Sequence, residues 1–394
     1  LSGHARFDAA GGDGPMVEAT IMGDLQRFGA GIPILNALLR DRVQLATDLR
    51  LARDGALTLS NLSLDSPNAR IRGELALPGD FASVEGDFTA AVPNAGVLEP
   101  ALNVPLEGAA ELRARLSGAL GDPGVTADLS LREAVVAGQR LGTARLQADV
   151  RTLASGPEGD IQLDTTAGPA GALDAETRFR LASDRLALSA MRAQVPGLDV
   201  RSERLDVPLS GGALDGTFAI TSDQVRPLLR RAAGLEADAA ADLTVRLGAD
   251  GAGGQRVELD GALTRVALPD GGPAVERIEL DGTVANAFAA PDADLTVELL
   301  RAAAGPLDLA RLTVTARGTP GDLDVRAEGE GRGEGTLDQP ITLSLAGNLG
   351  EDGPARVITL GEMRLAVGER TVELARTARL RLQGPEIAVQ DLAL

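Results

Sequence analysis

The chain has 394 residues, 57 acidic against 38 basic side chains and a formal net charge of −19, and all its basic residues are arginine. Such an acidic body is repelled by phosphate groups, which argues against binding to nucleic acid and against direct adsorption to anionic lipid. Without cysteine there are no disulfides and no thiolate metal sites, and no apolar run approaches the roughly 20 residues of a membrane-spanning helix.

The N-terminal part of the chain alternates apolar and polar residues, as half-buried strands do, with one interruption. Between Ile34 and Leu39 the apolar residues instead recur at helical spacing, after a Gly/Pro break. This pattern predicts a short helix near residues 32–42. Alternation then resumes from Leu49 to Phe88, with Asp54-Gly55 as a hairpin signal.

Residues 49–89 have a later counterpart in residues 179–219. The matched positions include Leu59 with Leu188, Gly86 with Gly216 and Phe88 with Phe218. Each copy runs into a segment rich in Pro and Leu, which predicts a helix near Leu98 and another at residues 223–234. We expect these helices to cap an open sheet edge, and a plug-like or membrane-facing role is the alternative.

A second repeat relates residues 116–151 to residues 280–317. Leu129 aligns with Leu295 and the triplet at 144–146 aligns with that at 310–312, once about two residues are inserted in the turn near Pro291. Side chains on a strand alternate faces with period 2, so an even insertion leaves the inside and outside of later strands unchanged. The repeat therefore keeps one apolar face throughout.

Short alternating strands separated by turn residues follow one another to the end of the chain. Roughly 25 to 30 strands exceed what one closed sandwich holds. We therefore predict an all-β fold: one continuous elongated repeat array over residues 1–394, forming a curved, U-shaped groove with a few short helices. The glycine-rich run at 328–335 is expected to be a frayed or disordered connection, because glycine weakens a strand interior.

Whether the apolar face is hollow or filled stays open. Alternating apolar residues are most often core, which favours a filled β-solenoid. The scarcity of aromatic residues, only 2% of the chain, leans the other way, since rings fill wide gaps between sheets well.

No pattern in the sequence indicates catalysis, a cofactor or a metal. His4, the single histidine, has no nucleophile or carboxylate cluster beside it in sequence. The run at 248–254 lacks the lysine of a phosphate-binding loop and is expected to be a turn. Asp292 and Asp294 lack the spacing of a calcium loop and are expected to lie in a solvated turn. We predict that the protein is not an enzyme.

The two copies LSGALGDPGVTADLSL and LDGTVANAFAAPDADLTVEL, each followed by ARLQADVR or ARLTVTAR, resemble the translocation and assembly module family of TamB, within the AsmA-like, bridge-like lipid transfer superfamily. The resemblance covers nearly the whole chain, and the Arg-only, Gly-rich, low-aromatic composition agrees with it.

The resemblance implies a periplasmic β-groove in a Gram-negative envelope, tethered to the inner membrane by a segment not present in this chain. It also implies an outer-membrane barrel partner, TamA, that binds regions outside this fragment. The expected roles are assembly of outer-membrane proteins such as autotransporters, and phospholipid transport between the membranes. The expected ligands are phospholipid acyl chains or unfolded outer-membrane proteins.

A conduit for acyl chains needs a continuous apolar lining, and each buried CH₂ is worth about 0.8 kcal/mol. The side chains expected to line it are Leu129, Leu131, Leu146, Leu295, Val297, Leu312 and Val314. A filled-core solenoid, acting as a structural protein or adhesin at the cell surface, is the competing hypothesis.

Overall fold

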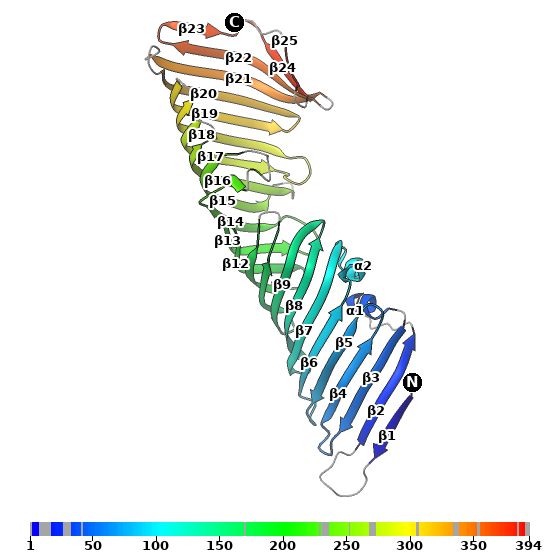
Figure 1. The fold of residues 1–394 in the computed structure, drawn as a ribbon. Helices are drawn as coiled ribbons and strands as arrows, with labels where there is room; N and C mark the ends of the chain where they lie inside the picture. The colour runs from blue at the N-terminus through cyan, green and yellow to red at the C-terminus, as the bar shows by residue number, and fades with distance from the viewer. Residues whose placement is uncertain are drawn as a thin grey trace. The chain divides into compact units, whose positions relative to one another are not determined.

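The computed structural model describes residues 2–7, 17–26, 33–40, 42–168, 171–227, 230, 236–251, 253–267, 273–304, 307–333, 339–352, 355–383 and 386–390. They form two compact units, Leu1–Pro196 and Gly197–Leu394. Almost all of the described chain is antiparallel β-structure (Figure 1). The all-β prediction is confirmed.

In the residues that the structure describes, the first unit has twelve strands. They are β1 (Ser2–Phe7), β2 (Val17–Gln26), β3 (Arg42–Leu51), β4 (Leu57–Asp65), β5 (Arg70–Leu77), β6 (Ser83–Val92), β7 (Leu106–Ala119), β8 (Asp122–Val136), β9 (Gln139–Arg151), β10 (Glu158–Thr165), β11 (Asp174–Leu181) and β12 (Arg185–Val195). Its helices are α1 (Pro33–Leu38), the 3₁₀ turn η1 (Ala95–Leu98) and α2 (Glu99–Leu102).

The second unit continues the strand series. Its strands are β13 (Leu198–Pro208), β14 (Asp215–Ser222), β15 (Asp238–Ala249), β16 (Gln255–Ala267), β17 (Ala274–Ala285), β18 (Asp292–Ala304), β19 (Leu307–Thr319), β20 (Asp322–Gly333), β21 (Pro340–Asp352), β22 (Ala355–Val367), β23 (Arg370–Glu373), β24 (Ala378–Gln383) and β25 (Glu386–Gln390). Half of the segment predicted as a helix at 223–234, namely residues 228–229 and 231–234, lies outside the described residues.

Within each unit the strands pair antiparallel with their neighbours in sequence, as a meander. In the second unit β22 is shared, because Arg364–Val367 pairs with β23 and Arg356–Leu360 pairs with β24. Among the described strands, the substantial contacts join hydrogen-bonded neighbours, so no second sheet packs on either unit. A filled solenoid, whose successive coils pair in parallel, is not the architecture of either unit.

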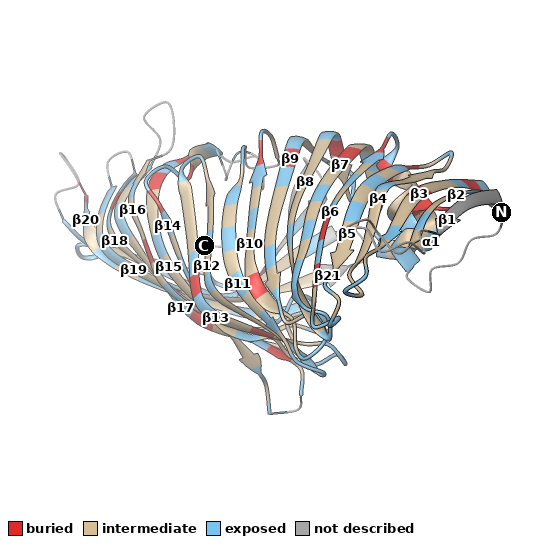
Figure 2. Cartoon of the chain, turned by 90° about the horizontal axis from the view of Figure 1, so that it is seen from below, coloured by how far each residue is buried: buried red, intermediate tan, exposed pale blue. Residues whose placement is uncertain are grey.

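Burial follows the alternation along the strands. Figure 2 shows half-buried and exposed residues alternating along many of the strands, with fully buried residues confined to a few places. In β7, for example, Leu112, Ala114 and Leu116 are half-buried while Arg113 and Arg115 between them are exposed. Each sheet therefore has an apolar face and a polar face.

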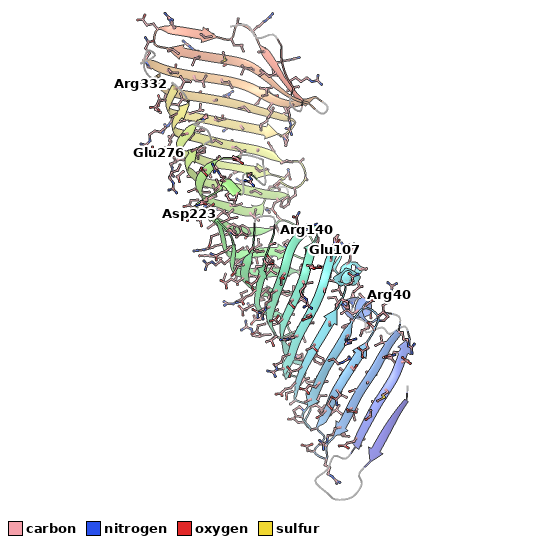
Figure 3. All side chains as sticks on the ribbon, in the orientation of Figure 1. Arg40, Glu107, Arg140, Asp223, Glu276 and Arg332 are labelled. Carbon is pink, nitrogen blue, oxygen red and sulfur yellow. The ribbon has the colours of Figure 1, made fainter. Side chains whose placement is uncertain are left out.

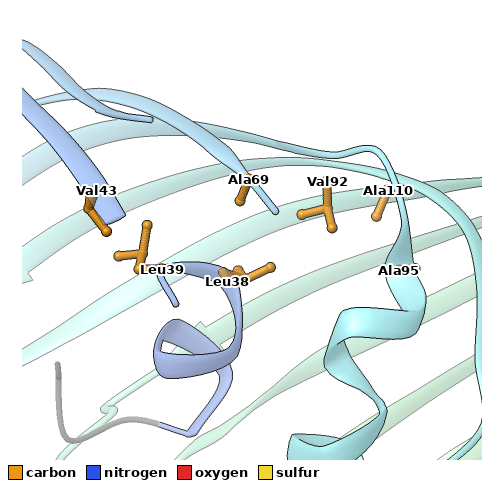
Figure 4. Close-up of a cluster of buried hydrophobic side chains, with 7 residues drawn as sticks. All are labelled: Leu38, Leu39, Val43, Ala69, Val92, Ala95 and Ala110. Atoms are coloured by element: carbon orange, nitrogen blue, oxygen red, sulfur yellow. The ribbon is translucent and has the colours of Figure 1, made fainter. Parts of the chain in front are cut away.

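The main buried cluster lies in the first unit, where α1 and η1 meet the strands. Its members are Leu38, Leu39, Val43, Ala69, Val92, Ala95 and Ala110 (Figure 4). Leu39 and Val43 are 1% and 0% exposed. The strands bend over the helical turns, so the helices cover part of the apolar face rather than the hydrogen-bonding edge expected from the sequence.

The reason for this position is the length and connectivity of the helices. A helix as short as α1 is not stable alone in water, so it forms only where its apolar side chains are buried. The loops that carry α1 and η1 join β2 to β3 and β6 to β7, away from the edge strand β1. The helices near 32–42 and Leu98 are confirmed, and their role as edge caps was wrong.

β-Bulges bend the strands at related places. Asn61 in β4 and Ala190 in β12 have φ values of 52° and 50° and lie in irregular pairings. These two residues occupy matching positions of the 49–89 and 179–219 repeat. A bulge bends its strand and increases the local twist, so the repeat preserves the curvature as well as the apolar pattern.

The second repeat shows a shift in register. Leu129 lies opposite Leu146 in the first copy, but in the second copy Val297 lies opposite Val314. The structural equivalents of Leu129 and Leu146 thus lie two residues beyond the aligned Leu295 and Leu312. The shift is even, so the faces assigned from the sequence are unaffected.

The glycine-rich run at 328–335 was wrongly expected to fray. Strand β20 continues to Gly333, while residues 334–338 lie outside the described residues. A Cβ at Gly329 would lie 3.1 Å from Leu312 Cδ1, and one at Gly331 would clash with the Asp308 carbonyl oxygen. The large neighbours on β19 cover these glycines, which a count of strand propensities cannot show.

Gly159 provides a test of this close strand packing. In the Gly159→Ala variant the new Cβ would clash with the Asp149 carbonyl oxygen, so we expect about 1–3 kcal/mol of destabilisation from overpacking. The measurement is the midpoint of urea unfolding. The control is Gly121→Ala, since nothing lies within 4 Å of a Cβ there. Equal midpoints for the two variants would contradict the packing.

Candidate functional site

The apolar face of the first unit carries an unbroken row of apolar residues that are direct partners on successive strands. From β3 to β12 the row is Leu45, Leu64, Ile71, Ala90, Leu112, Leu129, Leu146, Leu163, Ala175 and Ala193. Neighbouring strands are about 4.8 Å apart, so this row runs for on the order of 40 Å across the sheet. We call it row 1.

The second unit has an equivalent row, called row 2. From β13 to β22 it is Val200, Ile220, Leu243, Gly261, Leu280, Val297, Val314, Ala327, Leu345 and Met363. No charged or hydrogen-bonding side chain interrupts either row. Each sheet thus presents a continuous apolar strip to its surroundings.

All seven residues predicted to line the apolar face lie on it. Leu129 and Leu146 are partners in row 1, and Val297 and Val314 are partners in row 2. The others lie on the same faces, since Leu131 is two residues from Leu129, and Leu295 and Leu312 flank row 2 by two residues. Every one of the seven is half-buried, as expected of one face of an uncovered sheet.

One part of row 1 is covered. The helical cap, defined as Pro33–Leu39 together with Ala95–Leu102, supplies part of the buried cluster described above. Leu64, Ile71, Leu129 and Leu131 pack against that cluster. Ser66 Oγ donates a hydrogen bond of 2.7 Å to the Leu38 carbonyl, and Asn68 Nδ2 donates one of 3.2 Å to the Ala37 carbonyl. These anchoring residues were missed in the sequence, where Ser66-Pro67-Asn68 signals only a turn.

The polar faces are held by ion pairs between partner strands. Asp87 and Arg115 are direct partners, with Asp87 Oδ1 3.0 Å from Arg115 Nε. Asp294 and Arg317 are paired in the same way at 2.9 Å. Charged side chains project from the strands along both units, and Glu276 and Arg332 lie at one margin of the second (Figure 3). Pairs this exposed contribute little stability each, but they favour the correct register.

Two large hollows lie on the polar faces. One of about 950 Å³ in the first unit is bordered by Arg72, Asp87, Arg113, Asp128 and Gln147, and one of about 860 Å³ in the second by Asp242, Asp260, Glu279, Asp281 and Glu298. None of the seven predicted lining residues borders either hollow. These two hollows therefore do not belong to the predicted lining of the apolar faces.

The hollow of the second unit is acidic because like charges face each other across strands. Asp260 is the partner of Asp281, and Glu279 is the partner of Glu298. Direct like-charge partners destabilise a sheet slightly. Among the residues that the structure describes, no group of three or more histidine or acidic side chains has the geometry of a metal site.

The other candidate positions have ordinary structural roles where they are described. Of the run at 248–254, the first two residues end strand β15, and the described residues after them lie in the turn to β16, where Asp250 Oδ1 accepts a 2.6 Å hydrogen bond from the Gly254 amide. Asp292 and Asp294 lie in strand β18 instead of a turn, contrary to expectation, because the hairpin loop ends before them. His4 lies in β1, and its side chain is outside the described residues.

Asp128 on the polar face has a pKa that is changed by its neighbours. The Arg145 guanidinium donates hydrogen bonds to its carboxylate, and this contact holds the pKa of Asp128 below its ordinary value of 3.8. Gln147 and, at longer range, Arg113 act in the same direction. Since the folded pKa is the lower one, the pair stabilises the fold at neutral pH, and that contribution is lost as the pH falls below 3.8 through the folded pKa.

No protein-family model, curated protein or solved structure matched the chain. No helix in the described part of the chain is long and apolar enough to cross a membrane.

The role of Arg145 is tested by replacing it. In Arg145→Gln the pKa of Asp128 should rise toward its ordinary value, because the largest lowering contact is removed. The measurement is an NMR titration of the side-chain carboxyl carbon. Arg113→Gln is the matched control and should raise the pKa less, since Arg113 acts only at a distance. A larger rise in Arg113→Gln would refute this assignment.

Proposed function

We propose that the chain is a periplasmic section of a bridge-like lipid transfer protein of the TamB type, whose apolar faces hold the acyl chains of phospholipids. The observation that carries the proposal is the pair of unbroken apolar rows on sheets that have no second layer. The proposed setting is the Gram-negative envelope, with the outer-membrane barrel TamA as the proposed partner. Supporting the assembly of outer-membrane proteins belongs to the same proposal.

The energetics favour an occupied apolar face. Contiguous exposed apolar surface beyond a few hundred Å² is rare in soluble proteins and marks a binding surface. Leu146 and Val297 are half-buried with no described layer over them, so a ligand covering the rows would remove more apolar area from water. Burial of apolar surface contributes about 25 cal/mol per Å². A small additional buried area at each of the ten strands of a row therefore gives a substantial total binding free energy.

An acyl chain fits these rows better than an extended polypeptide does. Every backbone amide and carbonyl of a polypeptide needs a hydrogen-bond partner when it leaves water. Rows 1 and 2 carry only Leu, Val, Ile, Ala, Met and Gly side chains, which supply none. The backbone groups of interior strands are already used by their two neighbours. A hydrocarbon chain makes no such demand.

The absence of catalytic groups among the proposed ligand contacts agrees with this function, since moving a lipid breaks no bond. The competing adhesin hypothesis required a filled solenoid, and the antiparallel single-layer sheets do not supply one. We therefore propose no enzymatic activity and no cofactor for the chain.

A pair of neighbouring substitutions on β9 tests the proposal. Leu146→Arg places a charge in row 1, whereas Gln147→Arg places the same charge on the polar face. We expect Leu146→Arg to lower the amount of phospholipid bound from phosphatidylethanolamine vesicles by on the order of tenfold, the effect of about 1.4 kcal/mol. Gln147→Arg should bind like the unmodified protein. Equal losses in both variants would count against the apolar face.

A photo-crosslinking amino acid at Leu295 gives an independent test in the second unit. Its side chain lies beside row 2, so illumination in the presence of the same vesicles should attach lipid to it. The matched control carries the crosslinker at Thr296, the next residue, which borders the acidic hollow of the polar face. Attachment at Thr296 but not at Leu295 would overturn the proposal.

A further inference from the structure

The helical cap occupies part of the surface that the proposed function assigns to lipid. Leu129 and Leu131 were selected as lining residues from the sequence, and both pack against the buried cluster to which the cap contributes Leu38, Leu39 and Ala95. The rest of row 1, from Leu146 to Ala193, has no such cover among the described residues. An acyl chain and the cap therefore compete for the same positions.

The cap is held by few interactions. Its largest helix, α1, has six residues, fewer than an isolated helix needs for stability. Leu38, Leu39 and Ala95 are the buried side chains of the cap, and the hydrogen bonds from Ser66 and Asn68 fix the last turn of α1. The helix has too few residues to be stable by itself, so it stays folded only while these contacts are made.

The two parts of the cap are also loosely packed against each other. A hollow of about 610 Å³ lies between them, bordered by Pro33, Ala37, Asn68, Val97 and Pro100 among others. On the outer side, Ile34 is 41% exposed and Leu102 is 44% exposed. The cap thus carries apolar side chains on both sides, so it keeps an apolar surface toward a lipid when it moves off the strands.

We propose that the helical cap is a gate on the apolar face of the first unit. Seated, it occupies the positions around Leu129 and Leu131 and stops an acyl chain there. Displaced, it exposes them and restores an uncovered row 1 from β4 to β12. This inference rests on the proposed function, because it assumes that acyl chains use the row.

The structure offers a direct way to fix the gate shut. The natural chain has no cysteine, so an introduced pair holds the only two thiols. Ala37→Cys with Asn68→Cys joins α1 to the turn between β4 and β5, at residues already linked by a hydrogen bond. A short bifunctional thiol reagent then bridges the pair. The control pair, Ala76→Cys with Glu85→Cys, joins partner residues of β5 and β6 and leaves the cap free.

The readout is labelling by a phospholipid with a photoactivatable acyl chain, presented in phosphatidylethanolamine vesicles. Trypsin cuts after arginine, so the peptide Leu116–Arg132 reports on the covered positions and Thr152–Arg178 on the open part of row 1. Fragment ions separate adducts at Leu129 and Leu131 from those at Leu116 and Val125. Thermal unfolding of bridged and unbridged protein verifies that the sheet is intact.

Without a bridge, we expect adducts at Leu129 or Leu131 and also at Leu163. Bridging Ala37→Cys/Asn68→Cys should reduce the adducts at Leu129 and Leu131 by on the order of tenfold, because the state with the cap displaced, which binds the acyl chain at these positions, is no longer populated. Adducts at Leu163, and all adducts in the bridged control pair, should persist. Hydrogen exchange of the α1 amides should also become faster when lipid is added to the unbridged protein.

Two outcomes overturn the gate while leaving the proposed function intact. In one, bridging leaves the adducts at Leu129 and Leu131 unchanged. In the other, the unbridged protein is labelled at Leu163 but never at Leu129 or Leu131, so the cap does not move. Absence of label at every position in folded protein would instead refute the proposed function, and the gate with it.

Discussion

The structure depends on one constraint, which is that hydrogen-bonded strands keep the same side-chain parity across each sheet. A slip of a single residue at any pair would turn every later apolar residue to the polar face. The ion pairs between partners such as Asp87 and Arg115 penalise such a slip, because they would be broken by it. Bulges occur at several pairings, yet row 1 crosses the strands of the first unit and row 2 those of the second without an interruption. The apolar strip is thus a property of the register, and single residues in it are replaceable by others of similar character.

The parity explains why the faces were predictable from the sequence and the details were not. The alternation around Leu129 and Leu295 identifies a face whatever the partner strand is, since period 2 is a local property. The partner itself depends on where each hairpin turns, and this moved the equivalents of Leu129 and Leu146 to Val297 and Val314. A shift of the pairing register by an even number of residues does not change which face of the sheet a side chain lies on. The same insensitivity explains why the Leu295 and Leu312 assignments survive an alignment that is off by two residues.

The position of the cap and the presence of the hollows could not be predicted from the sequence, for a different reason. The helical spacing between Ile34 and Leu39 identifies α1, but its position depends on contacts with Ala69, Val92 and Ala110, which come from distant strands. The hollows depend on the bend of the sheet and on like-charge partners such as Asp260 and Asp281. The glycines also led to a wrong prediction. Gly329 and Gly331 indicate a break in the strand when only the sequence is considered, whereas in the structure Leu312 and the β19 backbone lie close against them. In each case tertiary contacts override a local preference.

The meander order of the strands has a consequence for how the chain reaches this state. Each strand bonds mainly to the strands just before and just after it, so nearly all native contacts are close in sequence. Folding of such a topology does not wait for distant segments to meet, and loop closure remains inexpensive. A new hairpin can add to the growing sheet as soon as its two strands are free, much as repeats add in other quasi-one-dimensional proteins. A chain that emerges gradually, end first, can therefore acquire its structure in the order in which it emerges.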